Sequence, residues 1–459
     1  MNGRQLVLAV LGLGWLLAIG VYVDAAPAGA ATTPSGQTIT PIKHFLFLMQ
    51  GDRSFDNYFG TYPGADGIPA AACQVYLAGD SPGGCVKPFD LHGNSVPPLG
   101  ATSAEVIKQY DKGQLDAFVS ALQSAGRDGT KVMGHYDQRD LPTAWRAAQN
   151  YVLFDRFFSS TMAGERSNRS YWVSGAGTSS TAPAVGPTTI FDRLQAAGIT
   201  WKFYVENYVP KDNFRGRSQT ATNTQTARVP LINYARFVDD PALSSHIVDL
   251  SQYYSDLRNG TLPAVAYLAS SGANERSGRS IPAGQKLISS LTGQLMLSKY
   301  WKSSAFLWSY DGSGGWYDHV NPPQVDGAGY GLRVPALLVS PYAKRGAVIH
   351  TALDYTSGLA FIEHNWRIAP LAARDAGAMP LTGAFDFGSP ARSPVLLSVD
   401  PKTAAPPPLA SMKIVYLSYG GAMLLVLASI CLATVRSARR TIAPVVKSPD
   451  LARVGADAL

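Results

Sequence analysis

Cysteine and charged residues are both scarce in this chain of 459 residues. Its 3 cysteines are too few for a small disulfide-dense scaffold or for a protein with several zinc sites. Charged residues make up 15% of the chain and hydrophobic residues 46%, so it can bury a large core, which excludes disorder over most of its length. The region 36–400 also lacks internal repeats and low-complexity tracts, and we interpret it as the folded body.

The body also lacks an excess of positive charge. The formal net charge is +7, but Arg4 and the net +3 of residues 436–459 supply more than half of it. Because nucleic-acid binding depends on a concentrated basic surface, we expect no nucleic-acid partner for the nearly neutral remainder.

Both ends of the chain predict export and membrane attachment. Residues 1–30 contain a basic residue, an apolar run and then small residues, which is the pattern of a signal peptide, with an uncleaved N-terminal anchor as the alternative. Residues 414–435 carry no charge and predict a C-terminal transmembrane helix, long enough to cross a hydrocarbon core of about 30 Å. Arginines follow at once, so we expect residues 436–459 in the cytoplasm and the body outside the cell membrane, joined by a Pro/Ala-rich spacer at 401–413.

Export agrees with the position of two cysteines. Cys73 and Cys85 flank a loop rich in Gly, Pro and Asp, and an oxidising compartment would let them form a disulfide. Two free thiols are the alternative. The third cysteine, Cys431, lies within the expected membrane span.

The body alternates buried strand patterns with helical patterns, which predicts an α/β fold whose mostly parallel sheet is flanked by helices on both faces. The expected strands cover residues 42–49, 200–205, 264–269, 305–310 and 334–340. The expected helices cover residues 104–125, 141–150, 189–197, 249–259, 283–297 and 357–365. In such folds the chemistry lies at the carboxyl ends of the strands, where Gly51-Asp52 and Asp311-Gly312 follow two of the apolar runs.

Six segments of the body carry a family resemblance. They are MQGDRSFDNYFG (49–60), GQLDAF (113–118), FDRFFSS (154–160), IVDLSQYYSDLRNGTLPAVAYL (247–268), YDGSGGWYDHVNPP (310–323) and RVPALLVSPYAKRGAVIHTALDYTSGLAFIE (333–363). In this order they resemble motifs of the phosphoesterase family that includes bacterial phospholipases C and a group of acid phosphatases. The resemblance implies an alkaline-phosphatase-like fold and hydrolysis of phosphate mono- or diesters with a metal ion, a Ser or Thr nucleophile and several histidines.

The resemblance implies that the metal site of this chain has fewer ligands than that of the family. Gly51-Asp52 stands where the family has a metal-binding Glu-Asn pair. Asp311 is kept, but its acidic partner in the family is Gly312 here. Asp52 and Asp311 are thus the metal ligands left for a divalent cation such as Mg²⁺ or Ca²⁺, which binds about six or more oxygen atoms.

The family residues that act on the phosphate are changed as well. Glu165 stands at the nucleophile position, and Arg276 stands where the family has a histidine. The positions that keep the family residue are Asp318, His319 and His350. The resemblance implies that the two histidines are catalytic and that Arg276 and Asp318 bring charge to the cleft.

The resemblance also implies that three carboxylates meet at the strand ends. Asp52, Glu165 and Asp311 would repel one another there unless a positive charge lies between them. A divalent cation and Arg276 are the two candidates. We favour Arg276, because its guanidinium can bridge carboxylates and the two glycines have removed oxygen ligands.

Two functions of different kinds follow. The first is a membrane-anchored extracytoplasmic hydrolase of phosphate esters or phospholipids, of phospholipase C or acid phosphatase type, with an altered metal site. The second is a catalytically silent binding or scaffold protein that uses the same cleft for a phosphate ester or a protein partner. The changed nucleophile, histidines and carboxylates favour the second.

Overall fold

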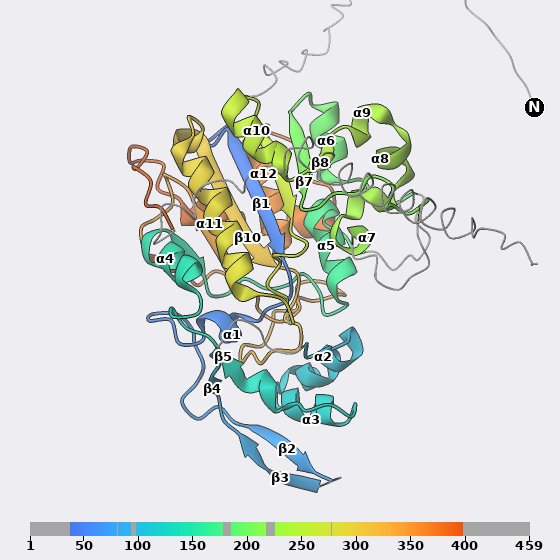
Figure 1. Ribbon diagram of the computed structural model, residues 1–459, viewed down its shortest axis with the longest axis vertical. Helices are drawn as coiled ribbons and strands as arrows, with labels where there is room; N and C mark the ends of the chain where they lie inside the picture. Colours follow the sequence, from blue (N-terminus) through green and yellow to red (C-terminus); the bar gives the residue numbers. More distant parts are fainter. Residues whose placement is uncertain are drawn as a thin grey trace, which may run out of the picture.

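The structure is a computed structural model that describes residues 37–79, 81–92, 98–177, 185–216, 225–276 and 278–397 (Figure 1). The expected signal peptide, spacer, membrane span and cytoplasmic tail lie outside these residues. Within the described part of the chain, no helix is both long and apolar enough to cross a membrane.

An 8-stranded sheet forms the centre of the body. Its spatial order is β12 (Ala347–Ile349), β6 (Val152–Phe154), β11 (Ala336–Val339), β10 (Ser304–Tyr310), β1 (His44–Gln50), β9 (Val265–Ala269), β7 (Trp201–Val205) and β8 (Ile247–Asp249). Neighbouring strands are parallel, except that β11 is antiparallel to both of its neighbours. The mostly parallel α/β sheet predicted from the sequence is therefore confirmed, and the five expected strands are all present. The strands that we did not predict in this sheet have 3 residues each, too few to show a hydrophobic period.

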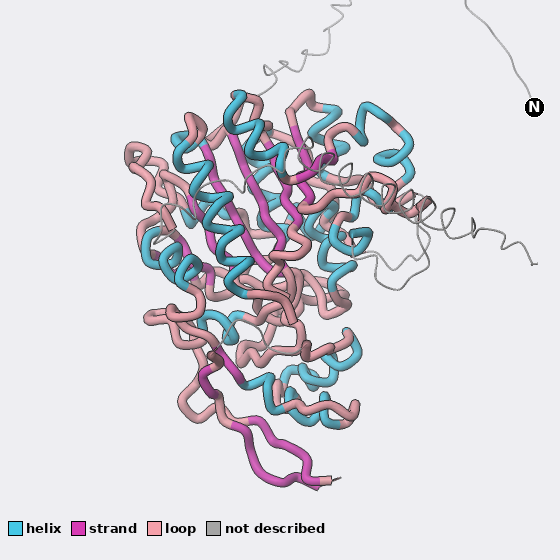
Figure 2. Tube along the Cα trace, in the orientation of Figure 1, coloured by secondary structure: helices cyan, strands magenta, loops and turns pink. Residues whose placement is uncertain are grey.

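Helices cover both faces of this sheet, as Figures 1 and 2 show. Helices α10 (Ser251–Asn259) and α11 (Ile281–Leu297) lie in front of it in Figure 1, and α12 (Tyr355–Trp366) lies behind. On β1, Phe45 and Phe47 point to one face, where their rings lie 5.0 Å from Phe361 of α12 and 5.7 Å from Trp172 of α5 (Glu165–Ser174). Coverage on both sides explains why β1 is a nearly continuous apolar run rather than an alternating one.

The other helices are short or peripheral to the sheet. They are α1 (Phe55–Phe59), α2 (Ser103–Tyr110), α3 (Phe118–Gln123), α4 (Pro142–Asn150), α6 (Ile190–Ala196), α7 (Gln225–Arg228), α8 (Ala235–Asp239), α9 (Pro241–Ser244) and α13 (Ala373–Ala376).

The single helix expected over residues 104–125 is wrong. The chain there forms α2 and α3, separated by a turn in which Asp111, Lys112 and Leu115 have φ of 39°, 53° and 57°. Left-handed backbone ends an α-helix, and Gly113 in the same turn adopts φ of 96°. Val106 and Tyr110 of α2 pack against the same core as the buried apolar residues of α3, so the hydrophobic pattern continues across the break and does not reveal it.

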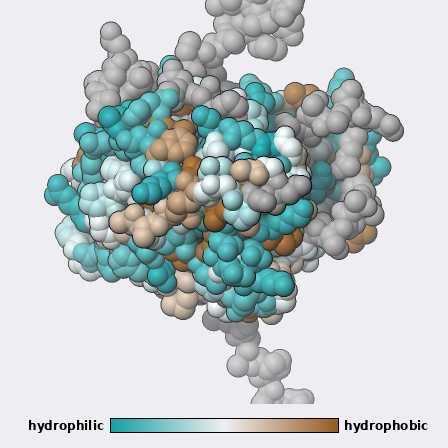
Figure 3. Space-filling model, turned by 90° about the horizontal axis from the view of Figure 1, so that it is seen from below, coloured by the Kyte–Doolittle hydropathy of each residue, from teal (hydrophilic) through white to brown (hydrophobic). Residues whose placement is uncertain are grey.

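A hairpin of β2 (Gln74–Ala78) and β3 (Ser81–Val86) extends from the lower end of the molecule in Figure 1. The structure contains the expected disulfide here, between Cys73 and Cys85, whose Cα atoms lie 5.6 Å apart. Nearby, β4 (Phe89–Asp90) pairs with β5 (Gly134–His135). Figure 3 views the molecule from this end and shows a mainly hydrophilic surface on which apolar residues form small separate areas.

Candidate functional site

A cleft lies at the carboxyl ends of three strands that are neighbours in the sheet, β10, β1 and β9. Asp311 follows β10 directly, Asp52 follows β1, and Arg276 lies on the loop after β9. Glu165 begins helix α5 and completes the group. Parallel strands end at the same edge of a sheet, and this topology brings together residues that are far apart in the sequence.

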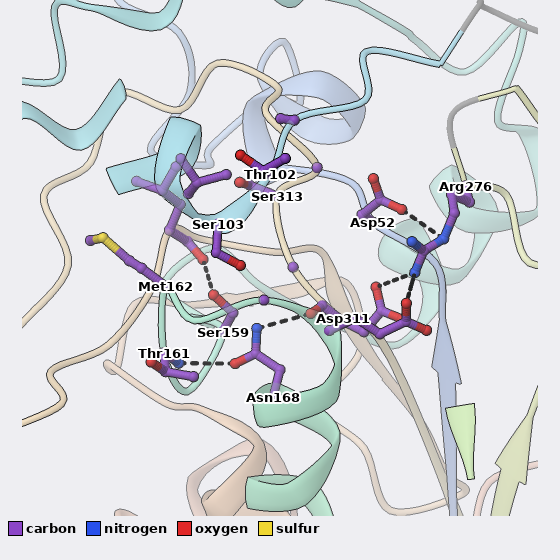
Figure 4. Close-up of a pocket in the computed structure, with 17 residues that line it drawn as sticks. Asp52, Thr102, Ser103, Ser159, Thr161, Met162, Asn168, Arg276, Asp311 and Ser313 are labelled. Carbon is purple, nitrogen blue, oxygen red and sulfur yellow. Dashed lines mark hydrogen bonds and ion pairs between the residues drawn. The ribbon is translucent and has the colours of Figure 1, made fainter. Parts of the chain in front are cut away.

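Arg276 lies at the centre of these carboxylates (Figure 4). Its Nε lies 2.9 Å from Asp52 Oδ1, and its Nη2 lies 3.0 Å from Glu165 Oε2 and 3.1 Å from Asp311 Oδ2. The planar guanidinium presents several N–H donors in fixed directions, which lets one side chain bridge three acids. The structure therefore brings together Asp52, Glu165, Asp311 and Arg276, the four residues that we expected to meet.

A second arginine, which we did not predict, contacts the same carboxylates. Arg169 is fully buried, its Nη2 lies 2.8 Å from Asp311 Oδ2, and it also donates to the backbone carbonyl of Gln50 at 3.2 Å. It stands one helical turn after Glu165 on α5, with Nε 3.6 Å from Glu165 Oε1. The spacing of four residues between a glutamate and an arginine was the signal in the sequence that could have identified it.

Burial and charge set the ionisation of the cluster. Burial raises the pKa of Glu165, and the neighbouring Asp311 carboxylate adds to this rise, while Arg276 and Arg169 oppose it. Burial works against the charge of Arg276, but Asp311, Asp52 and Glu165 more than offset it and raise its pKa. The guanidinium therefore stays charged, and Glu165 is the group whose proton is held more tightly than usual.

Gly51 is the position that lets the Arg276 loop approach β1. Its N–H donates to the backbone oxygen of Asn274 at 2.7 Å. A Cβ atom on residue 51 would lie 2.7 Å from the Cβ of Arg276 and 2.8 Å from the Asn274 oxygen, closer than carbon atoms and oxygen atoms normally come. A carboxylate side chain at residue 51 and the present position of Arg276 therefore exclude each other.

The donor set of the cleft does not fit a divalent metal. Arg276 occupies the space between the carboxylates, and each of the three acids has an oxygen within 2.9 to 3.1 Å of one of its nitrogen atoms. A metal ion needs those oxygens and is repelled by the guanidinium charge. Among the described residues, no group of three or more His, Cys, Asp or Glu side chains is arranged to hold a metal ion.

The cleft has a volume of about 340 Å³, and its other lining residues are uncharged and include several with hydroxyl groups. Figure 4 shows Thr102, Ser103 and Ser313 across the opening from Arg276 and Asp52. Thr102 caps helix α2, where its side chain exchanges hydrogen bonds with Glu105. The cleft thus has a charged side, whose acids are already paired, and an uncharged hydroxyl side.

Asp318 and His319 do not line this cleft, contrary to expectation, but belong to a second cluster around Arg333. Arg333 is fully buried, with Nε 2.8 Å from Asp318 Oδ1 and Nη2 3.0 Å from Asp56 Oδ1. Burial raises the pKa of Asp318 to about 6. His319 Nδ1 lies 2.7 Å from Asp56 Oδ2, and although burial disfavours its charge, this hydrogen bond raises the pKa of His319.

His350 is also outside the cleft lining. It is 61% exposed, and its Nδ1 lies 2.7 Å from Asp155 Oδ2. Asp66 connects the two histidines, because its N–H donates to Asp155 Oδ2 at 2.8 Å and its Oδ1 lies 3.3 Å from His319 Nε2. The structure therefore groups His319 with His350 through two aspartates, and does not bring either histidine to Glu165.

Comparison with known proteins supports the resemblance seen in the sequence. The model of the Phosphoesterase family matches residues 42–369. Phospholipase C A of Mycobacterium tuberculosis is 27% identical over 466 residues, which covers 86% of each chain. The non-hemolytic phospholipase C of Pseudomonas aeruginosa is 26% identical over 422 residues, 77% of this chain and 58% of that protein. Among solved structures, a protein of the alkaline phosphatase superfamily from Vibrio parahaemolyticus is 12% identical, with a TM-score of 0.35 over 73% of this chain and 70% of that one, a likeness too low to place site residues. The chain belongs to the phosphoesterase family.

Proposed function

We propose that this protein is a catalytically silent member of the phosphoesterase family that uses its cleft to bind a ligand or a protein partner. The observation that carries the proposal is the position of Arg276, which is paired with all three carboxylates at the strand ends. An arginine is not a Lewis acid, and the residue at the nucleophile position, Glu165, is held in an ion pair rather than free to attack phosphorus.

The histidines support the same proposal. His319 and His350 are each paired with an aspartate, and neither is among the residues that line the cleft with Glu165. Hydrolysis by this family is expected to need a metal, a nucleophile and histidines, and in this chain the metal ligands, the nucleophile position and one histidine position, Arg276, are altered.

The proposal also places the protein at the cell membrane. The apolar segment 414–435 would anchor it, with the body outside and residues 436–459 in the cytoplasm. The disulfide between Cys73 and Cys85 is consistent with an oxidising compartment outside the cytoplasm. Protease added to intact cells should remove the body and spare a tag placed after Leu459, whereas loss of the tag would contradict this topology.

A hydrolase assay tests the proposal of a silent cleft. The purified protein should not hydrolyse p-nitrophenyl phosphate or a phosphorylcholine ester above the uncatalysed rate, with or without added Mg²⁺, Ca²⁺, Mn²⁺ or Zn²⁺. Turnover that rises with an added metal and is lost in Glu165→Ala would contradict it and establish an active phosphate-ester or phospholipid hydrolase of altered site. The matched control is Asp116→Ala, which removes an exposed carboxylate away from the cleft.

A further inference from the structure

Glu165 has a place in the cleft that differs from those of the other two acids. It is the first residue of α5, a helix of 10 residues, and the residue before it, Gly164, provides no side chain to cap the helix. The N–H groups of a first helical turn have no partners within the helix, and together with the helix dipole they favour a negative charge. The Glu165 carboxylate lies at this positive end, where an anion would otherwise be stabilised.

The two guanidinium groups that contact Glu165 are both engaged with carboxylates. Glu165 Oε2 lies 3.0 Å from Arg276 Nη2, and its Oε1 lies 3.6 Å from Arg169 Nε. Asp311 contacts both arginines, and Asp52 contacts Arg276. Three carboxylates therefore contact two guanidinium groups, and both guanidinium groups that contact Glu165 are already paired. Arg228 also interacts electrostatically with Glu165, but it is not among the residues that line the cleft.

The open part of the cleft does not change this balance. Its other lining residues, such as Ser103, Ser313 and Met162, are uncharged. The side chains of Glu165 and Asp52 are 25% and 18% exposed, so both carboxylates are accessible to a ligand that enters the cleft. A phosphate that entered would meet two like charges at close range.

We propose that Glu165 is an internal anion: its carboxylate occupies the place of a phosphate group against Arg276 and the start of α5, and so excludes phosphate esters from the cleft. This specificity-determining role rests on the proposed function and refines it, because it predicts that the ligand of the silent cleft is not a phosphate ester. It also predicts that removal of the carboxylate frees Arg276 to bind an external anion.

Titration with inorganic phosphate by isothermal titration calorimetry tests the role of Glu165. The dissociation constant for phosphate should be at least about tenfold lower for Glu165→Ala than for the wild-type protein. The double variant Glu165→Ala/Arg276→Ala should lose this binding. Asp116→Ala, which removes one exposed carboxylate elsewhere, should behave as the wild type.

Two results would overturn this inference. One is phosphate binding by the wild type as tight as that of Glu165→Ala, and the other is no binding by a Glu165→Ala protein whose circular dichroism and cooperative unfolding show that it is folded. Glu165→Gln provides a further check, since it keeps the size of the side chain and removes only the charge, and it should bind phosphate more tightly than the wild type. Metal-dependent hydrolysis by the wild type would overturn the proposed function instead, so the two failures are distinguishable.

Discussion

Two arginine-centred clusters hold carboxylates in this protein, and they differ in their access to water. Arg333 has no exposed side-chain surface, and its partners Asp56 and Asp318 are 1% and 0% exposed. Arg276 is 34% exposed, and it borders a cleft together with Asp52 and Glu165. The same pairing chemistry therefore supports the fold in one place and lines an open site in the other.

The two clusters also differ in how their residues relate to the family motifs. Asp318 and His319, which match family motifs, lie in the closed Arg333 cluster. Glu165 and Arg276, which depart from the family, lie in the open cleft and contact each other. Asp311, which is kept from the family, joins them in the cleft, so the cleft combines a retained acid with two changed residues.

The largest effect is expected in the closed cluster. Arg333→Ala leaves Asp56 and Asp318 buried without their cation and should lower the free energy of unfolding by about 3–5 kcal/mol. Denaturant unfolding measures it. Arg156→Ala is the control, because Arg156 is 45% exposed and pairs with Asp66 at the surface, and it should cost less than about 1 kcal/mol. Equal losses in the two variants would show that burial does not distinguish these arginines.

A smaller loss is expected for the arginine of the open cleft. Arg276→Ala should cost about 2–3 kcal/mol, because Asp52 and Glu165 keep contact with water and Asp311 keeps Arg169. Arg276→Lys should recover only part of this loss, since one ammonium group cannot bridge three acids. An Arg276→Ala protein as stable as the wild type would contradict the structural role of the guanidinium.

The close approach of the Arg276 loop to β1 gives a third comparison, between two glycines. Gly51→Ala adds a Cβ that meets Arg276 and the Asn274 carbonyl, and it should cost about 1–2 kcal/mol. Gly272, earlier in the loop that carries Arg276, has no atom closer than 4.0 Å to an added Cβ. Gly272→Ala should therefore be tolerated, and a loss equal to that of Gly51→Ala would mean that the contact at residue 51 is not the cause.

The smallest effect concerns the pH dependence of stability in the closed cluster. The pKa of His319 is raised above its usual 6.5 by Asp56, so the charged histidine stabilises the fold fully below that value. This contribution should be lost as the pH rises through the folded-state pKa. The stability difference between wild type and His319→Gln should therefore shrink by about 1 kcal/mol or less between pH 6 and 9. A difference that stays constant over this range would show that His319 does not titrate there.

Much of the fold and part of the site were predictable from the sequence. The buried strands showed as apolar runs, and the polar residues after two of them indicated the positions of Asp52 and Asp311, while the family resemblance indicated Arg276. The break between α2 and α3 was not predictable from hydrophobic spacing, because both helices face the same core. The positions of His319 and His350 depend on long-range pairing with Asp56 and Asp155, which no local pattern reports.

The central claim is that Arg276, and not a metal ion, holds the three carboxylates of the cleft together. The metal content of the wild-type protein, purified without chelators and measured by inductively coupled plasma mass spectrometry, tests it most directly. Our account predicts substoichiometric amounts of every divalent metal, and an unfolding midpoint that EDTA does not change. One tightly held metal ion per chain, removed by EDTA together with a sharp fall in that midpoint, would contradict it.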